Sequence, residues 1–476
     1  MNAELIVTDI LFGQSYYLRF DPKLWEAMQP YPPLGTLYAA SYVREHGYTV
    51  ALFDAMLAES EDEWGILLDE HKPQYAIIYE DNFNYLSKMC LLRMREAAFR
   101  MIQMAKSRGA IVILCGADAT DHYSEYLDKG ADYCLLGEGE ETLVELLGKL
   151  SAGKEAGQVI GLASPTTLRP SRRPDISDLD KLPFPAWDLV DIEKYRAIWL
   201  KRHGYFSMNM VTTRGCPYHC NWCAKPIWGQ RYNSRSPENV AAEVKWLKEN
   251  FAPDHIWFAD DILGLKPNWI EKFAMLLNAA DVVIPFKCLQ RADLVNEKTA
   301  AALANAGCKT VWIGAESGSQ KILDAMDKGD HVEDIYRAAK LLHDNGIEVG
   351  FFLQFGYPGE MWDDVRKTLK MVRECAPDDI GISVSYPLPG TKFFERVKLE
   401  LGEKQNWVDS DDLAMLYRGP FPTEFYRVLH GRVHYEFRSW KVLRRPSLRG
   451  LLNIPRNILG LAVSELRLRK YVRTVA

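Results

Sequence analysis

Between Arg214 and Cys223 the sequence reads Arg-Gly-Cys-Pro-Tyr-His-Cys-Asn-Trp-Cys, a C-x3-C-x2-C spacing that places three thiols on one short loop. Crowded cysteines in a reducing compartment favour metal binding over disulfides. Iron–sulfur clusters are normally held by four thiolates, so three can hold a cubane and leave one iron without a protein ligand. A structural zinc ion needs a fourth ligand, and His219 lies where one loop could hardly direct all four groups at one ion. The spacing therefore favours iron–sulfur chemistry over zinc.

The residues around this loop alternate short apolar runs with helical patterns. The loop follows an expected strand at 208–212, and further strands are expected at 255–259, 284–289, 310–314, 349–354 and 381–385. Their spacing of about 30 residues is that of a β-α-β unit. We expect a (β/α)6 partial barrel over residues 205–400, with its chemistry on the loops that follow the strands.

The first 160 residues show the same alternation at closer spacing. Apolar runs occur at 4–8, 49–53, 75–79, 110–114 and 133–136, and helical patterns separate them. Strands that alternate with helices predict a Rossmann-like open parallel sheet, with ligands beyond the carboxyl ends of its strands. A proline-rich linker is expected at 161–204 and a mainly helical region at 401–476. The expected fold class is therefore α/β, with a helical C-terminal region.

The composition excludes several classes of protein. Of the 476 residues, 47% are hydrophobic and 26% are charged, which fits neither a disordered chain nor a membrane-embedded one. No window reaches the roughly 18 uninterrupted apolar residues of a spanning helix. The N-terminus carries an acid and no basic region before its apolar run, so it does not read as a secretion signal. We expect a cytoplasmic protein.

The cysteine loop and the five β/α units after it resemble the radical S-adenosylmethionine (SAM) superfamily. The resemblance implies a 4Fe-4S cluster held by Cys216, Cys220 and Cys223, with SAM bound at the fourth iron. An electron from the cluster would then cleave SAM to methionine and a 5′-deoxyadenosyl radical. The resemblance also implies SAM contacts from an aromatic residue in the loop and from polar residues at the ends of later strands. These are Trp222, Asp260, Arg291, Glu316 and Gln354.

An open α/β domain before such a barrel resembles the cobalamin-binding subgroup of that superfamily, as does the linker segment at 182–188. Many of its members carry D-x-H-x-x-G, whose His binds cobalt; here Asp54 matches, but Met56 stands in place of the His. A thioether is a much poorer cobalt ligand than an imidazole. Either cobalamin binds without a lower ligand from the protein, or the domain has lost the cofactor. The expected cobalamin contacts are Pro33, Gly35, Asp54, Gly116, Glu138 and Gly139.

The related methylthiotransferases hold a second cluster on three N-terminal cysteines, which raises the question of Cys90, Cys115 and Cys134. Cys134 lies within an apolar strand pattern and Cys90 within a helical run. Buried structural thiols are therefore the better interpretation, and methylthiolation of RNA is not expected.

The C-terminal region is strongly basic. Residues 426–476 carry a formal charge of +10, whereas the rest of the chain carries −16. From Leu448 to Leu468 large aliphatic residues alternate with arginines, and Pro455 is expected to divide any helix there into two. An apolar face rimmed by cations suits an anionic membrane surface, and it suits nucleic acid less well because aromatic stacking groups are lacking. Docking onto the protein's own barrel is the third possibility.

Two chemistries fit these features. One is methylation of an unactivated carbon of a small or lipid-like substrate, with cobalamin as the methyl carrier. The other is an oxidative cyclisation, as in the anaerobic magnesium-protoporphyrin ester cyclase branch, which the tail resembles along with the hopanoid-associated branch. Both need an external electron donor of the flavodoxin or ferredoxin type, and both allow peripheral contact with the inner face of the membrane. A non-catalytic cobalamin or iron–sulfur sensor would need no adenosyl pocket, which the polar residues of the barrel argue against.

Overall fold

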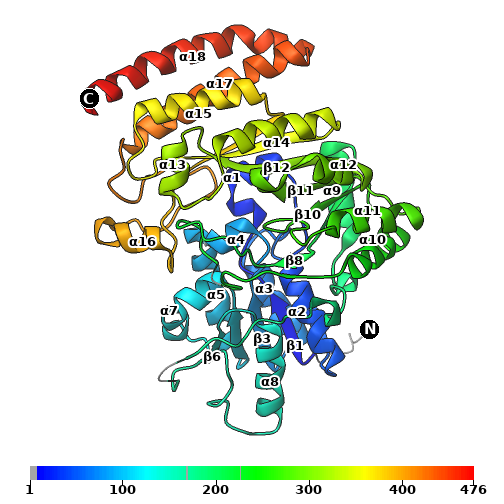
Figure 1. Ribbon diagram of the computed structural model, residues 1–476. Helices are drawn as coiled ribbons and strands as arrows, with labels where there is room; N and C mark the ends of the chain where they lie inside the picture. Colours follow the sequence, from blue (N-terminus) through cyan, green and yellow to red (C-terminus); the bar gives the residue numbers. More distant parts are fainter. Residues whose placement is uncertain (1–7, 90, 168–169, 226, 476) are drawn as a thin grey trace. The chain divides into compact units, whose positions relative to one another are not determined.

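The computed structural model describes residues 8–89, 91–167, 170–225 and 227–475 (Figure 1). The chain divides into two compact units. The first comprises Met1–Pro217, Ala224–Phe286 and Asn406–Asp412; the second comprises Tyr218–Cys223, Lys287–Gln405 and Leu413–Ala476.

The first unit contains a six-stranded sheet in the order β2-β1-β3-β4-β5-β6. Its parallel strands are β1 (Ile10–Gly13), β2 (Val50–Leu52), β3 (Tyr75–Tyr79), β4 (Ile111–Cys115) and β5 (Tyr133–Leu135), and β6 (Leu162–Ala163) pairs antiparallel with β5. Alternate residues face opposite sides. Leu11, Ile78 and Val112 pack on one face, whereas Phe12 and Ile77 pack on the other. Both faces are apolar because helices cover both, as is usual for a parallel sheet.

The helices of this sheet are α1 (Pro22–Ala27), α2 (Leu34–Glu45), α3 (Asp62–His71), α4 (Tyr85–Met89), α5 (Leu92–Lys106), α6 (Ala117–Asp121), α7 (Tyr123–Asp128) and α8 (Glu140–Ser151). The open parallel sheet is confirmed. The strand expected at 4–8 lies outside the described residues except for Thr8, and the first strand of the sheet is β1. The expected linker contains a helix, α9 (Ile192–His203), whose Trp199 is fully buried and donates a hydrogen bond to the Pro30 carbonyl over 2.7 Å.

The second sheet has the strand order β14-β13-β12-β11-β10-β7, so every strand neighbours the one before it in the chain. The first unit supplies β7 (Ser207–Met210), α10 (Pro237–Phe251), β10 (His255–Phe258) and α11 (Trp269–Ala279), and the boundary between the units runs through β11 (Phe286–Gln290). The second unit supplies α12 (Glu297–Asn305), β12 (Cys308–Glu316), α13 (Gln320–Ala325), α14 (Val332–Asp344), β13 (Glu348–Phe355), α15 (Trp362–Cys375), β14 (Asp379–Val384) and α16 (Lys392–Val397). The predicted partial barrel is confirmed.

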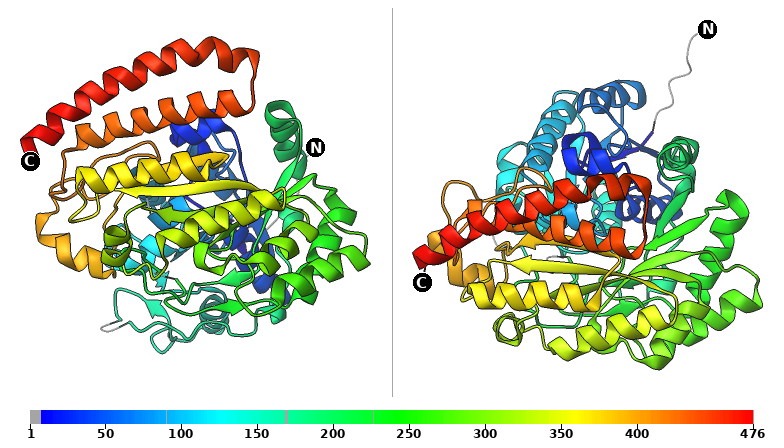
Figure 2. Two further views of the ribbon diagram at one scale, coloured as in Figure 1. Left: turned by 45° about the horizontal axis from the view of Figure 1, so that its top comes forward. Right: turned by 90° about the horizontal axis from the view of Figure 1, so that it is seen from above.

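The second unit ends in two long helices, α17 (Thr423–Arg444) and α18 (Leu448–Val475), which lie side by side as a hairpin (Figure 2). The helical C-terminal region is confirmed, but the division at Pro455 is wrong because α18 runs through that residue. The ring of Pro455 is exposed to solvent, where water can satisfy the Leu451 carbonyl that loses its helical donor. Within the described residues, no helix has the length and hydropathy needed to cross a membrane.

Candidate functional site

The cysteine loop leaves the first unit from a short antiparallel pair, β8 (Thr213–Arg214) with β9 (Asn233–Ser234). Gly215, the residue before the first cysteine, has φ +82°, a conformation that side chains rarely adopt. A Cβ at this position would also collide with the Arg231 carbonyl oxygen. The turn into the loop therefore requires glycine twice over, for its backbone angle and for its lack of a side chain.

Asp260, which follows β10, holds the backbone just before this turn. Its carboxylate accepts hydrogen bonds from the backbone N–H groups of Thr212 (2.7 Å) and Thr213 (2.6 Å) and from both threonine hydroxyls. Burial raises the pKa of Asp260 to about 6, and these four donors oppose the rise. Asp260, which the sequence predicted as a SAM contact, therefore fixes the start of the cysteine loop.

In the second unit Asn221 fastens the loop between its last two cysteines. Its backbone N–H donates to the Met326 carbonyl over 2.9 Å, and its side-chain amide donates to the Ala325 carbonyl over 2.8 Å. The hydroxyl of Tyr357 donates to its side-chain oxygen over 2.7 Å, and its carbonyl accepts from the backbone of Phe393. Sequence reasoning missed Asn221, because a lone asparagine carries no motif of its own.

Arg291 lies against the same segment. Its guanidinium carbon is 3.7 Å from the centre of the Tyr218 ring, and its Nη1 is 4.0 Å from the sulfur of Cys220. Asp293 and the Lys328 carbonyl hold the other side of the guanidinium, at 2.9 and 3.0 Å. The predicted cation is therefore brought beside one of the predicted cluster thiols.

Glu316 ends β12 with a backbone φ of +55°, which is uncommon for a residue with a side chain. It is buried and forms an ion pair with the buried Lys328 at 3.4 Å. Burial opposes the charge on Lys328, but Glu316 and Asp330 raise its pKa above the ordinary value. Strained backbone of this kind collects at functional sites.

Several buried polar atoms of the second unit have no partner within the protein. They include both carboxylate oxygens of Asp330, Oε1 of Gln354 and the indole N–H of Trp222. Leaving such a group unpaired costs about 1–3 kcal/mol. These atoms suit a ligand with amine, hydroxyl and carboxylate groups, and two of the three residues were expected from the sequence to contact SAM.

Eight of the nine cysteines lie within the described residues. Cys216, Cys220 and Cys223 are half-buried, whereas Cys115, Cys134, Cys288, Cys308 and Cys375 are buried, and none of these eight forms a disulfide. Cys90 lies outside the described residues. Among the described residues, no three His, Cys, Asp or Glu side chains converge on one point as they would around a single ion.

A second group of unpaired polar atoms follows the strands of the open sheet. Both side-chain atoms of Gln14 and Oδ1 of Asn82 are buried without a partner. Between them Glu80 accepts hydrogen bonds from the backbone and hydroxyl of Ser15, and burial raises its pKa to about 7. The sequence analysis missed these residues, which come directly after β1 and β3. They suit a large polar ligand at this edge of the sheet.

The expected cobalamin residues lie at the same edge. Pro33 precedes α2, whose Gly35 N–H donates to Asp81 over 3.0 Å. A Cβ at Gly116 would meet Glu80 at 2.8 Å, and one at Gly139 would press on Tyr79 at 2.9 Å. Asp54 accepts a 2.7 Å hydrogen bond from the Tyr195 hydroxyl. All of these residues have packing or hydrogen-bonding partners in the protein itself.

Glu138 connects this edge to the start of the cysteine loop. It forms a buried ion pair with Arg214, two residues before Cys216, and Arg214 also contacts Glu140 at 2.8 Å. The indole of Trp228 donates a hydrogen bond to Glu138 over 3.1 Å. Since Arg214 is only 3% exposed, its charge depends on these two carboxylates. Residues of the open α/β domain therefore hold the strand that leads into the loop.

Comparison with known proteins gives one family match and several similar relatives. Residues 210–372 match the radical SAM superfamily. The chain is 28% identical, over 76% of its length and 78% of the relative's, to an uncharacterised methyltransferase of Pyrococcus horikoshii. It is 27% identical, over 79% of its length and 67% of the relative's, to an anaerobic magnesium-protoporphyrin IX monomethyl ester cyclase of Rubrivivax gelatinosus.

Two solved structures share the fold. One is the cobalamin-dependent SAM radical enzyme OxsB, with a TM-score of 0.74 and 17% identity over 99% of this chain and 76% of that one. The other is the radical SAM methyltransferase TsrM of Kitasatospora setae, with a TM-score of 0.66 and 19% identity over 82% of this chain and 78% of that one. The structure of TsrM contains cobalamin and a 4Fe-4S cluster, and that of OxsB contains aqua-cobalamin.

Proposed function

We propose that this chain, whose residues 210–372 match the radical SAM superfamily, is a cobalamin-dependent enzyme that methylates an unactivated carbon of a small or lipid-like substrate. One observation carries the proposal. Within the second unit, which fastens the cysteine loop through Asn221, buried polar atoms of Trp222, Asp330 and Gln354 have no partner in the protein. Such an arrangement suits polar cofactors rather than a structural ion.

Cys216, Cys220 and Cys223 would hold a 4Fe-4S cluster, which when bound would supply the electron that cleaves SAM into methionine and a 5′-deoxyadenosyl radical. Arg291 is placed beside Cys220 to pair with the SAM carboxylate, since guanidinium matches carboxylate geometry. Asp330 and Glu316 offer acceptors for the amine, and Gln354 and Trp222 offer polar atoms to the remaining groups. Asp260 acts through the loop that it holds.

Cobalamin, when bound, would carry to the substrate a methyl group taken from a second molecule of SAM. Gln14 and Asn82 would bind its amide side chains, and Pro33, Gly35, Asp54, Gly116, Glu138 and Gly139 would shape the edge on which it lies. Met56 is buried where related domains carry a histidine, so the protein supplies no imidazole at that position.

A second candidate function is oxidative cyclisation. The observation that favours it is the similarity to the Rubrivivax cyclase over 79% of this chain. Both functions use the same cluster and SAM residues, and both take electrons from a small flavodoxin- or ferredoxin-type donor. They differ in whether methyl groups are consumed: only methyl transfer converts SAM to S-adenosylhomocysteine as well as to 5′-deoxyadenosine.

The deciding experiment is anaerobic purification with cofactor reconstitution, followed by iron, sulfide and cobalt analysis and an assay for reductive formation of 5′-deoxyadenosine. We expect about four irons per chain, one equivalent of cobalt and SAM cleavage. Cys220→Ala should lose both the cluster and the cleavage, whereas Cys375→Ala, which changes a buried thiol of α15, should retain them.

Each failure has a distinct meaning. A Cys220→Ala protein that kept full SAM cleavage would falsify the cluster assignment. A normal cluster without cobalt after cobalamin supplementation would remove the second cofactor and leave the radical chemistry in place. A protein that binds both cofactors but never cleaves SAM would be a sensor.

A further inference from the structure

Helix α18 runs beside α17 (Figure 2), and several of its large aliphatic side chains are exposed to solvent. Leu452 is 75% exposed and Leu466 is 63% exposed. With their neighbours they form a stripe of helical spacing, here named the α18 face. Its members are Leu451, Leu452, Ile458, Leu459, Val463 and Leu466.

The opposite side of α18 faces α17, and it carries small and polar residues together with Leu468, which is fully buried. A Cβ at Gly450 would meet Val442 at 2.6 Å, and one at Gly460 would meet the ring of Tyr435 at 2.6 Å. Glu465 pairs with Arg432 of α17 at 3.0 Å. The six residues of the α18 face remain exposed to water although the hairpin is closed. An exposed apolar stripe of this kind marks an interaction site in a stable protein.

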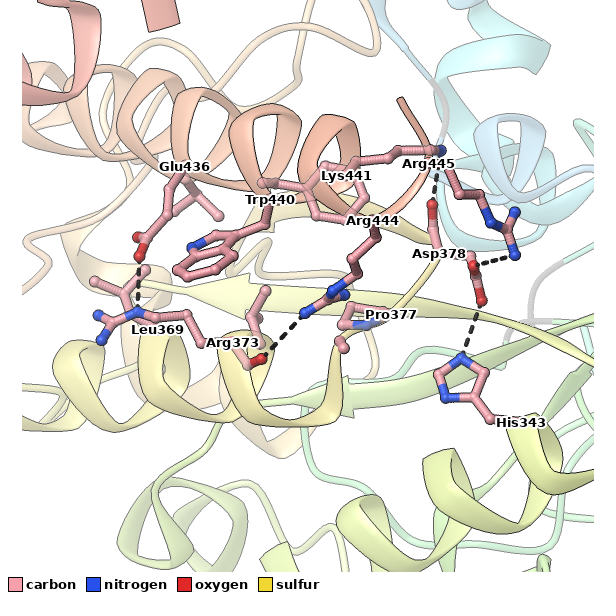
Figure 3. Close-up of a pocket in the computed structure, with 14 residues that line it drawn as sticks. His343, Leu369, Arg373, Pro377, Asp378, Glu436, Trp440, Lys441, Arg444 and Arg445 are labelled. Atoms are coloured by element: carbon pink, nitrogen blue, oxygen red, sulfur yellow. Dashed lines mark hydrogen bonds and ion pairs between the residues drawn. The ribbon is translucent and has the colours of Figure 1, made fainter. Parts of the chain in front are cut away.

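Helix α17 is held against the rest of the second unit by ion pairs and hydrogen bonds, so the hairpin that carries the α18 face is anchored. In the groove between α15 and α17, Glu436 pairs with Arg373 at 2.7 Å, and Lys441 donates to the Asp378 carbonyl over 2.8 Å (Figure 3). Arg445 pairs with the Asp378 carboxylate at 3.1 Å. These contacts bind α17 along its C-terminal half, directly before the turn into α18.

The positive charge of α18 indicates which kind of partner binds the α18 face. Arg456, Arg467, Arg469, Lys470 and Arg473 are all exposed, and the one acidic residue, Glu465, is already paired. A second copy docked by two-fold symmetry would bring these like charges together. Single-stranded nucleic acid would need aromatic side chains for stacking, and the α18 face is aliphatic. A layer of anionic headgroups over hydrocarbon satisfies both the cations and the leucines.

We propose that α18 binds the surface of an anionic phospholipid bilayer, lying in its plane with the α18 face in the acyl region and the cations at the headgroups. The inference names a partner for the proposed enzyme, and the membrane would be where it meets a lipid-like substrate. Binding requires neither cofactor, so it is measured independently of the radical chemistry.

The test is sedimentation of the full anaerobically purified chain with phosphatidylglycerol-containing vesicles, with pure phosphatidylcholine vesicles as comparison, at low and high salt. Leu452→Gln/Leu459→Gln/Leu466→Gln should weaken binding at least about tenfold, because it removes apolar area that enters the bilayer. Arg456→Gln/Arg467→Gln/Lys470→Gln should weaken it about fivefold for each cation at low salt. The matched control is Ile66→Gln/Met275→Gln/Leu399→Gln, which removes equally exposed apolar residues elsewhere and should bind like the unaltered protein.

Because every altered side chain is exposed, thermal midpoints and SAM cleavage should be unchanged in all three variants. The proposal is overturned if the leucine variant sediments like the control, or if zwitterionic and anionic vesicles bind equally at low salt. It is also overturned if sedimentation velocity shows a dimer that the leucine variant dissociates, since a second copy then covers the face. Retention of an RNA oligomer without vesicle binding would assign the cations to nucleic acid instead.

Discussion

At the scale of single residues, Asn221 does most to hold the cysteine loop in the second unit. Asn221→Ala removes the side-chain bonds to the Ala325 carbonyl and the Tyr357 hydroxyl. At about 1 kcal/mol for each, the loop loses about 2 kcal/mol of local stability. We expect iron content after reconstitution to fall several-fold with an almost unchanged far-ultraviolet circular dichroism spectrum. Asn250→Ala, which loses one exposed helical contact, is the control and should keep full iron content.

Glu360, directly before α15, gives the protein a pH dependence that one substitution can isolate. It is fully buried, accepts a 2.6 Å hydrogen bond from the Gly356 N–H and leaves its other oxygen unpaired. Burial raises the pKa of Glu360 to about 8 from an ordinary 4.5. Between pH 4.5 and about 8 the folded state therefore keeps a proton that the unfolded state has lost. The free energy of unfolding therefore falls as the pH rises through this range. Each pKa unit corresponds to about 1.4 kcal/mol.

Glu360→Gln keeps the shape of the protonated side chain. Its thermal midpoint should match that of the unaltered protein near pH 5 and exceed it by several degrees near pH 8. Glu333→Gln, at an exposed position of α14, serves as the control and should show no such divergence. Parallel pH profiles for Glu360→Gln and the unaltered protein would show that Glu360 is ionised in the folded state.

At the scale of elements, the turn from β8 into the cysteine loop depends on Gly215. Gly215→Ala must adopt φ +82° and also push against the Arg231 carbonyl. Gly229→Ala, with φ +60° and open space around its Cβ, carries only the conformational cost of about 1 kcal/mol. The difference between the two variants isolates the collision. We expect Gly215→Ala to lower the thermal midpoint several degrees more than Gly229→Ala does, and to lose the cluster. Equal losses of thermal midpoint in the two variants would show that the collision with Arg231 does not contribute.

The helices and strands also show which structural features can be predicted from the sequence alone. The six strands of the second sheet were predicted within a few residues, since buried parallel strands are continuous apolar runs between helical patterns. The predicted helix break at Pro455 was wrong, because a helix can tolerate a proline whose ring is exposed to solvent. The sequence alone does not show whether the ring is exposed. Asn221 and Gln14 were not predicted for a related reason. Asn221 matters through a hydrogen bond to a residue distant in the sequence, and Gln14 through its burial without a partner, and both depend on the fold.

At the scale of the whole molecule, the open α/β domain and the cysteine loop are joined through one buried cation. Arg214 stands between Glu138, at the end of the first sheet, and Glu140, at the start of α8. Removing one partner of a buried ion pair leaves an uncompensated charge, at about 3–5 kcal/mol. Arg214→Met should therefore lower the thermal midpoint sharply and reduce both iron and cobalt content.

A triple variant tests whether the unpaired carboxylates cause the loss of stability in Arg214→Met. Arg214→Met/Glu138→Gln/Glu140→Gln removes the stranded carboxylates, so at least half of the lost stability should return, as measured by the thermal midpoint. Cofactor content should recover less, because the neutral side chains no longer fix the strand that leads to Cys216. If the triple variant is less stable than Arg214→Met, packing rather than charge holds this junction, and the two cofactor sites are coupled through shape.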